Sequence, residues 1–181
     1  SDGDLMEGIS HEAISIAGHM KLARLIVLYD DNNITIDGSL DLAESGDALA
    51  RFEAAGWTAV RIDGHDIEAI EDAIAAAQNS DKPSLIACRT VIGYGAPNKQ
   101  GTSGVHGAPL GDDEIGLTRE MLGWDAPAFE IPAELRDAWR MAGRAHASAR
   151  KAWEQRLAEQ SAETSNRFER CLLYTSPSTR D

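Results

Sequence analysis

The stretch SDGDLMEGISHEAISIAGHMKLARLIVLYDDNNITIDG (residues 1–38) decides the fold. It begins with an Asp-Gly pair, continues with a helical pattern over residues 4–22, and then has an apolar run at 25–28 that leads into Asp-Asp-Asn-Asn. This order predicts a loop, a helix, a buried strand and a second loop. In a parallel α/β unit these two loops meet at the carboxyl edge of the sheet, where such sheets bind ligands. We therefore expect an α/β fold with a ligand site between the two loops.

The two loops supply oxygen ligands of the kind that Mg²⁺ prefers. Mg²⁺ takes about six oxygens and usually shares them with substrate phosphates. Asp2 offers a carboxylate oxygen, Asn32 an amide oxygen and Ile34 its backbone carbonyl. Gly3 has no Cβ, so its N–H can approach a phosphate closely, and a helix start presents unpaired N–H groups to an anion. We expect a site for Mg²⁺ and a diphosphate, with Ca²⁺ or Mn²⁺ as alternative ions.

Each loop also has an ordinary structural explanation. Asp-Gly before a helix is common as a turn and an N-cap, and Asp-Asn-Asn after a strand is common as an Asx turn. An EF-hand interpretation of residues 30–38 fails, because the calcium loop needs glycine at its sixth position and Thr35 stands there. The pair of motifs, about thirty residues apart, favours a binding site.

The helical pattern over residues 4–22 has an apolar stripe that we expect to face the core. Glu7 and Glu12 fall on its other faces, where acidic residues usually complement the helix dipole or face solvent. The stripe consists of Met6, Ile9, Ala13, Ile16, Ala17 and Met20.

Strand and helix patterns alternate further along the chain, and this alternation predicts a parallel sheet wound in βαβ units with flanking helices. Helices are expected at residues 47–55 and 67–77, and strands at 57–62 and 84–91. His65 stands in a tight turn just before the second of these helices, so we expect it to be structural.

The chain divides into three segments by pattern. Residues 1–125 form the predicted α/β domain, and residues 126–170 form a helical linker with little core of its own. Residues 171–181 continue no helical pattern, and we interpret them as a non-native tail. The chain opens on the Asp-Gly motif without the strand that a parallel sheet places before it, so we expect a fragment.

Composition limits the partners. The chain has 17 basic and 30 acidic residues, for a formal charge of −13, which argues against nucleic acid or an anionic membrane as a partner. Its two cysteines, Cys88 and Cys171, make no disulfide framework and suit a reducing, cytoplasmic compartment. The sequence has no apolar run of eighteen residues, so nothing in it indicates a membrane span.

Many short blocks of this chain resemble one enzyme family. Asp-Gly followed by Asn-Asn is similar to the thiamine-diphosphate motif. Compared residue by residue, the sequence resembles transketolase over roughly residues 1–140. The blocks agree in order and spacing; they lie at residues 2–12, 29–38, 51–57, 63–66, 82–86, 92–99, 106–111, 117–120 and 122–124.

The resemblance implies roles for single residues. It implies that Ile36 packs near the thiazolium ring of the cofactor. It implies that His106, in the long glycine-rich loop 92–111, reaches the diphosphate and the donor sugar, although a lone loop histidine is most often a surface residue. It also places Glu7 and Glu12 near a dimer interface, in a carboxylate network that links two cofactor sites.

The resemblance further implies an activity. Transketolases use thiamine diphosphate and Mg²⁺ to move a two-carbon ketol unit from a ketose phosphate to an aldose phosphate, and a homodimer completes their active site. We expect the 181-residue chain to be inactive alone, because a glutamate of the partner subunit activates the cofactor in this family. The open alternatives are dihydroxyacetone synthase, a non-catalytic half of a split transketolase, and an α/β domain that has lost its site.

Overall fold

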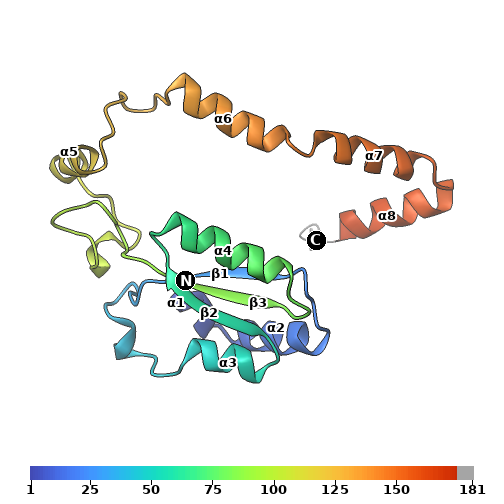
Figure 1. The fold of residues 1–181 in the computed structure, drawn as a ribbon, viewed down its shortest axis with the longest axis horizontal. Helices are drawn as coiled ribbons and strands as arrows, with labels where there is room; N and C mark the ends of the chain where they lie inside the picture. Colours follow the sequence, from blue (N-terminus) through green and yellow to red (C-terminus); the bar gives the residue numbers. More distant parts are fainter. Residues whose placement is uncertain (175–181) are drawn as a thin grey trace, which may run out of the picture. The chain divides into compact units, whose positions relative to one another are not determined.

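A three-stranded parallel sheet lies at the centre of residues 1–125 (Figure 1). The computed structural model describes residues 1–174 of the chain. Strand β3 (Ser84–Arg89) is central, and β1 (Ile26–Asp31) and β2 (Thr58–Asp63) pair with it on either side. The predicted α/β class with a parallel sheet and flanking helices is confirmed.

The register aligns the carboxyl ends of all three strands. Asp31 of β1 and Asp63 of β2 both pair with Arg89 of β3. The loops that leave these strands therefore start from one edge of the sheet, and this is the edge where the sequence predicts ligand binding.

Helices cover both faces of the sheet (Figure 1). Helices α2 and α3 pack on one face, where Phe52 and Trp57 make an edge-to-face contact with ring centroids 4.9 Å apart. Helix α4 packs on the other face against Ile86 and Cys88. The helices of residues 1–125 are α1 (Asp2–Met6), α2 (Gly8–His19), α3 (Ala48–Ala54), α4 (Ile67–Gln78) and α5 (Asp112–Met121), with short 3₁₀ turns at Leu40–Leu42 and Ser103–Val105.

The single helix predicted over residues 4–22 is wrong. The structure breaks it at Glu7, whose extended backbone (φ −65°, ψ 137°) separates α1 from α2. The break changes which side of α2 meets the sheet, so the buried positions are Ile14, Ala17 and Gly18.

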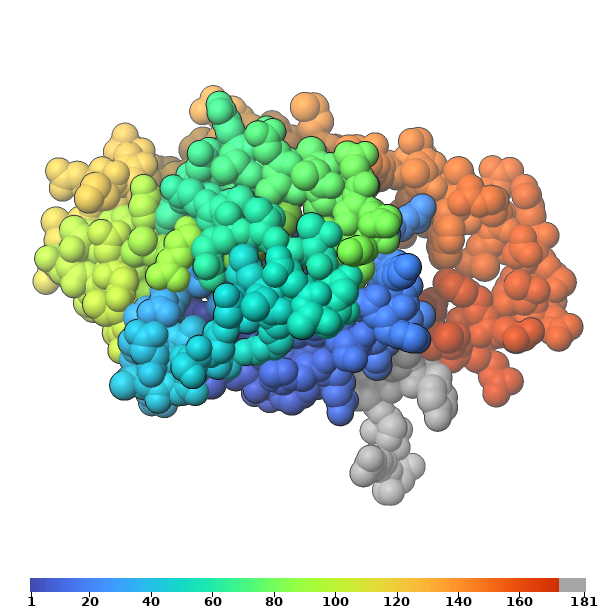
Figure 2. All heavy atoms as spheres, turned by 60° about the horizontal axis from the view of Figure 1, so that its bottom comes forward, coloured from blue at the N-terminus to red at the C-terminus, as the bar shows by residue number. Residues whose placement is uncertain are grey.

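Most of the predicted apolar stripe is consequently exposed. Ile9, Ile16 and Met20 are 70%, 59% and 60% exposed, and Ala17 is the one stripe residue that is buried. Figure 2 shows blue atoms of this N-terminal part at the surface. Ile67, the first residue of α4 (Ile67–Gln78), is also exposed.

Residues 126–174 form a separate unit of three helices, α6 (Ala133–Arg144), α7 (Ala147–Ala158) and α8 (Ala162–Tyr174). None of residues 126–172 is buried, and Trp153 makes an edge contact with Phe168. Helix α8 continues four residues past 170, so the expectation that residues 171–174 follow no helical pattern is wrong. The remainder of the predicted non-native tail, residues 175–181, lies outside the described residues.

In residues 1–174, no helix is both long enough and apolar enough to span a bilayer.

Candidate functional site

Asp2 joins the start of α1 to the loop that follows β1. Its side chain is only 2% exposed, although it is a carboxylate. One carboxylate oxygen accepts a hydrogen bond from the Tyr29 hydroxyl, and the other accepts one from the Asn33 backbone N–H at 3.0 Å. The two motifs that are thirty residues apart in sequence therefore meet in space.

The loop after β1 is a tight turn stabilised by its own side chains. The Asn32 amide oxygen accepts a hydrogen bond from the Ile34 N–H at 2.9 Å, and Asn33 has a left-handed backbone with φ 62°. Thr35 N–H donates to the Gly38 carbonyl at 2.8 Å. The Asx turn weighed as a structural explanation is thus present. It leaves the Asn32 oxygen a second lone pair for another partner.

The environment of Asp2 is suited to a cation. Burial, and then the hydrogen bond to Asp2, raises the pKa of Tyr29 well above its usual value, so Tyr29 stays a neutral donor. Within residues 1–174 no basic side chain forms an ion pair with Asp2. A buried carboxylate with only neutral donors is costly unless a positive charge accompanies it.

A metal ion at Asp2 would need oxygen ligands other than carboxylates. No three His, Cys, Asp or Glu side chains of the described residues gather as a metal cluster. The loop that Asp2 contacts through the Asn33 N–H also carries the amide of Asn32 and the carbonyl of Ile34, and phosphate oxygens of a ligand would add to them.

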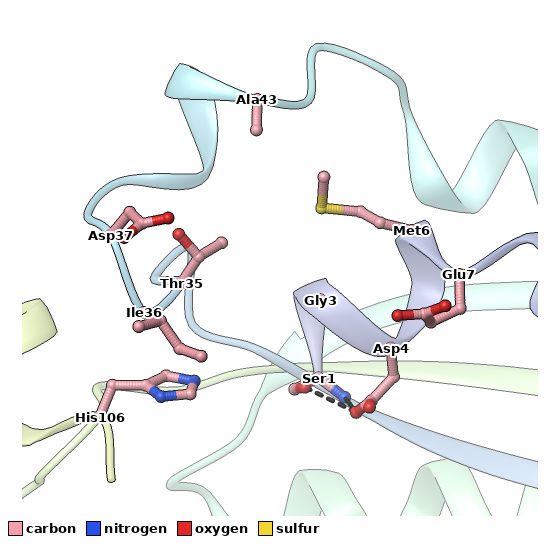
Figure 3. Close-up of a pocket in the computed structure, with 10 residues that line it drawn as sticks. All are labelled: Ser1, Gly3, Asp4, Met6, Glu7, Thr35, Ile36, Asp37, Ala43 and His106. Atoms are coloured by element: carbon pink, nitrogen blue, oxygen red, sulfur yellow. Dashed lines mark hydrogen bonds and ion pairs between the residues drawn. The ribbon is translucent and has the colours of Figure 1, made fainter. Parts of the chain in front are cut away.

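A cavity of about 460 Å³ opens between α1 and the two long loops (Figure 3). Figure 3 shows His106 beside Ile36, with Gly3 across the cavity from them. A Cβ on Gly3 would meet no atom within 4 Å, so the backbone of α1 is open to the cavity at this position. The lining residues are Ser1, Gly3, Asp4, Met6, Glu7, Thr35, Ile36, Asp37, Ala43 and His106.

Carboxylates dominate the charge of this cavity. Asp4, Glu7 and Asp37 line it, and His106 is the one basic side chain among the lining residues. Hydrogen bonds from the Ser1 hydroxyl (2.6 Å) and the Ser1 amino group (2.9 Å) lower the pKa of Asp4, so this carboxylate stays ionised. A diphosphate would therefore need a bound cation to offset the negative lining.

His106 is carried by the long loop of residues 92–111, and a buried glutamate fastens that loop. Glu114, in the first turn of α5, accepts hydrogen bonds from the Asn98 backbone N–H at 2.8 Å and from the Asn98 side chain at 2.9 Å. Both bonds lower the pKa of Glu114, and the bond from the Asn98 side chain contributes most. Lys99 Nζ also donates to the Leu110 carbonyl at 2.7 Å, which closes the loop upon itself.

A second cavity, of about 670 Å³, lies over the carboxyl ends of the strands. Beneath it, the buried Asp31 accepts hydrogen bonds from Arg61 Nε at 2.8 Å and Arg89 Nη1 at 3.0 Å. Asn32 lines this second cavity, together with His65.

The structure brings together some of the residues singled out from the sequence and separates others. Gly3, Glu7, Ile36 and His106 share the first cavity. Glu12 lines a different, shallow depression on α2 with His11, Ser15 and Ile16.

Sequence reasoning missed the residues that hold the two loops. Tyr29 could have been found, because it stands near the carboxyl end of a predicted strand beside the Asn-Asn turn. Glu114 and Asn98 gave no local signal, since they are sixteen residues apart and lie in different elements.

The chain matches the family model described as "Transketolase, thiamine diphosphate binding domain" over residues 1–175. It is 60% identical to a transketolase of Cereibacter sphaeroides over 86% of this chain and 24% of that protein. The chain thus spans about a quarter of the length of the curated relatives it matches.

The chain is also similar to solved structures of transketolases. A transketolase structure from Campylobacter jejuni matches with a TM-score of 0.81 and 39% identity, over 90% of this chain and 26% of that one. A Pichia stipitis transketolase, solved in complex with sedoheptulose-7-phosphate, matches with a TM-score of 0.78 and 40% identity, over 85% of this chain and 23% of that one.

Proposed function

The chain belongs to the family of transketolase thiamine-diphosphate-binding domains, and from that premise we propose that it is the diphosphate- and Mg²⁺-binding part of a cytoplasmic ketol transferase. The whole enzyme would move a two-carbon ketol unit from a ketose phosphate to an aldose phosphate. The Pichia stipitis transketolase with bound sedoheptulose-7-phosphate supports sugar phosphates as the substrate class. The curated relatives carry the name transketolase, which favours this enzyme over dihydroxyacetone synthase.

The observation that carries the proposal is the buried carboxylate of Asp2 beside an acidic cavity. Asp2 has neutral hydrogen-bond donors and no cation partner among the described residues. The cavity next to it is lined by carboxylates, so it would repel an unaccompanied diphosphate. Asp2 would hold a bound Mg²⁺, which would supply the positive charge that both the buried carboxylate and the diphosphate need.

Different residues of the chain would bind the metal ion and the diphosphate. Asp2, Asn32 and the Ile34 carbonyl would hold the metal ion, with Ca²⁺ or Mn²⁺ able to replace Mg²⁺. Gly3 would donate its backbone N–H to the diphosphate, since its open position allows close approach. Thiamine diphosphate supplies the carbanion chemistry of ketol transfer when bound.

The remaining residues of the cavity would orient the reacting groups. Ile36, which is 73% exposed on its loop, would pack against the thiazolium ring. His106 would donate a hydrogen bond to the diphosphate and to a hydroxyl of the donor sugar. Glu7, between α1 and α2, and Glu12, on α2, would face a second subunit of a homodimer, since both are exposed.

We also propose that this chain has no ketol-transfer activity by itself. It spans about a quarter of the length of its relatives. The resemblance also implies that the glutamate that activates the cofactor comes from a different domain of the partner subunit. Turnover by the 181-residue chain with excess cofactor would contradict this part of the proposal.

Calorimetric titration of the chain with thiamine diphosphate, with and without Mg²⁺, tests the binding function. We expect binding that requires Mg²⁺ and is lost in Asn32→Ala. Asn166→Ala is the matched control, because it removes the same amide from an exposed position on α8. Binding by Asn32→Ala equal to wild type would refute the assignment of the metal ligand.

A further inference from the structure

His65 contacts the beginning of the loop that carries His106. It lies in the turn between β2 and α4, and its Nε2 accepts a hydrogen bond from the Val91 backbone N–H at 3.0 Å. Its ring also stacks on Tyr94, with centroids 4.1 Å apart and planes inclined by 26°. The His65 side chain therefore contacts both the Val91 peptide, just before the loop, and the Tyr94 side chain within the loop.

The residues on either side of His65 hold its turn close to the end of β3. The Gly64 N–H donates to the Arg89 carbonyl at 2.8 Å, so the turn lies directly against the end of β3. A Cβ on Gly64 would stand 2.5 Å from Thr90 Cγ2 and 3.0 Å from the Arg89 oxygen, which is too close for any residue but glycine. The Asp63 carboxylate accepts the His65 backbone N–H at 2.9 Å and fixes the turn from its other side.

The segment that His65 holds packs against the residues just before His106. The Gly101 N–H donates to the Ile92 carbonyl at 2.8 Å. A Cβ on Gly93 would lie 2.9 Å from Val105 Cγ2, so the Gly93 backbone and the Val105 side chain are in contact. A displacement at residues 91–94 would therefore move Val105, and His106 with it.

We propose that His65 is a positioning residue that holds His106 over the cofactor cavity through the Val91 hydrogen bond and the Tyr94 stack. The proposal rests on the proposed function of His106 as a diphosphate and sugar contact. His65 does not line the first cavity, where His106 lies, and its contacts with Val91 and Tyr94 are the route by which it acts on that loop.

Three variants separate the hydrogen bond from the aromatic contact. His65→Phe keeps a ring for Tyr94 and removes the acceptor for Val91. His65→Gln keeps an acceptor near the position of Nε2. His19→Gln is the matched control, because His19 is an exposed histidine in the last turn of α2.

The first measurement is Mg²⁺-dependent binding of thiamine diphosphate by calorimetry, with the melting temperature recorded for each variant. We expect His65→Phe to weaken cofactor binding about tenfold, a loss typical of one hydrogen bond that orders a binding group. His65→Gln should recover most of that loss, and the three melting temperatures should agree. Binding losses that simply follow losses of melting temperature would overturn the positioning role.

The second measurement follows the His106 imidazole signal by NMR without cofactor, and it stands even if the wild-type chain fails to bind. That failure would count against the proposed function, whereas the NMR signal reports on positioning alone. We expect the signal to shift and broaden in His65→Phe and to return in His65→Gln. An unchanged His106 signal in His65→Phe would overturn the inference.

Discussion

The loop of residues 31–39 and the loop of residues 92–111 are both held by a buried carboxylate. Asp2 is 2% exposed and accepts the Asn33 N–H at 3.0 Å, and Glu114 is 6% exposed and accepts the Asn98 N–H at 2.8 Å. The difference lies in what else each carboxylate does. Asp2 stands at the proposed metal site itself, whereas Glu114 fastens its loop from outside the cavity.

The two carboxylates differ in whether groups of the protein alone stabilise their buried charge. Hydrogen bonds from Asn98, and then the positive charge of Lys99, lower the pKa of Glu114, so the protein alone stabilises this carboxylate. Asp2 meets a hydroxyl and one N–H, and its buried charge remains without a cation partner in the described residues. This contrast is the reason that we propose a metal site at Asp2 and none at Glu114.

The largest expected effect is that of Asp2→Ala, which removes the loop contact and the proposed metal ligand together. The Tyr29 hydroxyl and the Asn33 N–H would both lose a buried acceptor, so the free energy of unfolding should fall by about 3 kcal/mol. Urea unfolding measures this loss, with Asp72→Ala on the exposed face of α4 as control. Equal stability of the two variants would contradict the role given to Asp2.

Gly3→Ala should affect the cavity without affecting either loop. A Cβ on Gly3 meets no protein atom within 4 Å, so stability should be kept or slightly raised by the better helix former. Cofactor binding should weaken about fivefold, because the methyl group keeps phosphate from the backbone N–H.

Gly8→Ala provides the comparison for that variant. Its Cβ also meets nothing within 4 Å, but Gly8 starts α2 and does not line the cavity. Calorimetry should find its cofactor affinity equal to wild type. The same loss in both variants would mean that the effect comes from the helices and not from contact with phosphate.

Acid should release the Glu114 loop, and this is the smallest expected effect. Hydrogen bonds from Asn98 lower the pKa of Glu114 from its ordinary value of 4.5. The ionised form therefore stabilises the loop above that pH, and the contribution is lost as the pH falls through the lowered pKa. NMR shifts of the Asn98 amides between about pH 6 and pH 3 follow this change. A flat titration curve for Asn98 would contradict it.

The sequence predicted the sheet better than the helix beside it. The apolar runs around Leu85 and Val27 both form parallel strands, as expected. The expected burial holds for β3 but is wrong for the run at residues 25–28, where Leu28 is 52% exposed because β1 lies at an edge of the sheet. The 4–22 pattern suggested one helix because apolar residues recur at helical spacing. Nothing in that spacing reveals that Glu7 takes an extended backbone and turns α2 onto Ile14 and Ala17.

The candidate site was predictable where it depends on chain order and hidden where it depends on distant side chains. The meeting of Asp2 with the Asn-Asn turn follows from a loop, a helix and a strand in a parallel fold. The bonds from His65 to Val91 and from Asn98 to Glu114 join elements that no local pattern connects. Such contacts can be identified only in the folded structure, where the strands bring their loops to one edge of the sheet.

The most direct test of the central claim compares Asp2→Asn with Glu114→Gln. Both changes remove a buried charge and keep only one of the two accepting oxygens, so each should weaken its loop, as protonation does for Glu114. Calorimetry with thiamine diphosphate and Mg²⁺ should find binding abolished in Asp2→Asn and retained in Glu114→Gln. Wild-type affinity in Asp2→Asn would contradict the account, because the charge of Asp2 would then have no part in binding the metal ion.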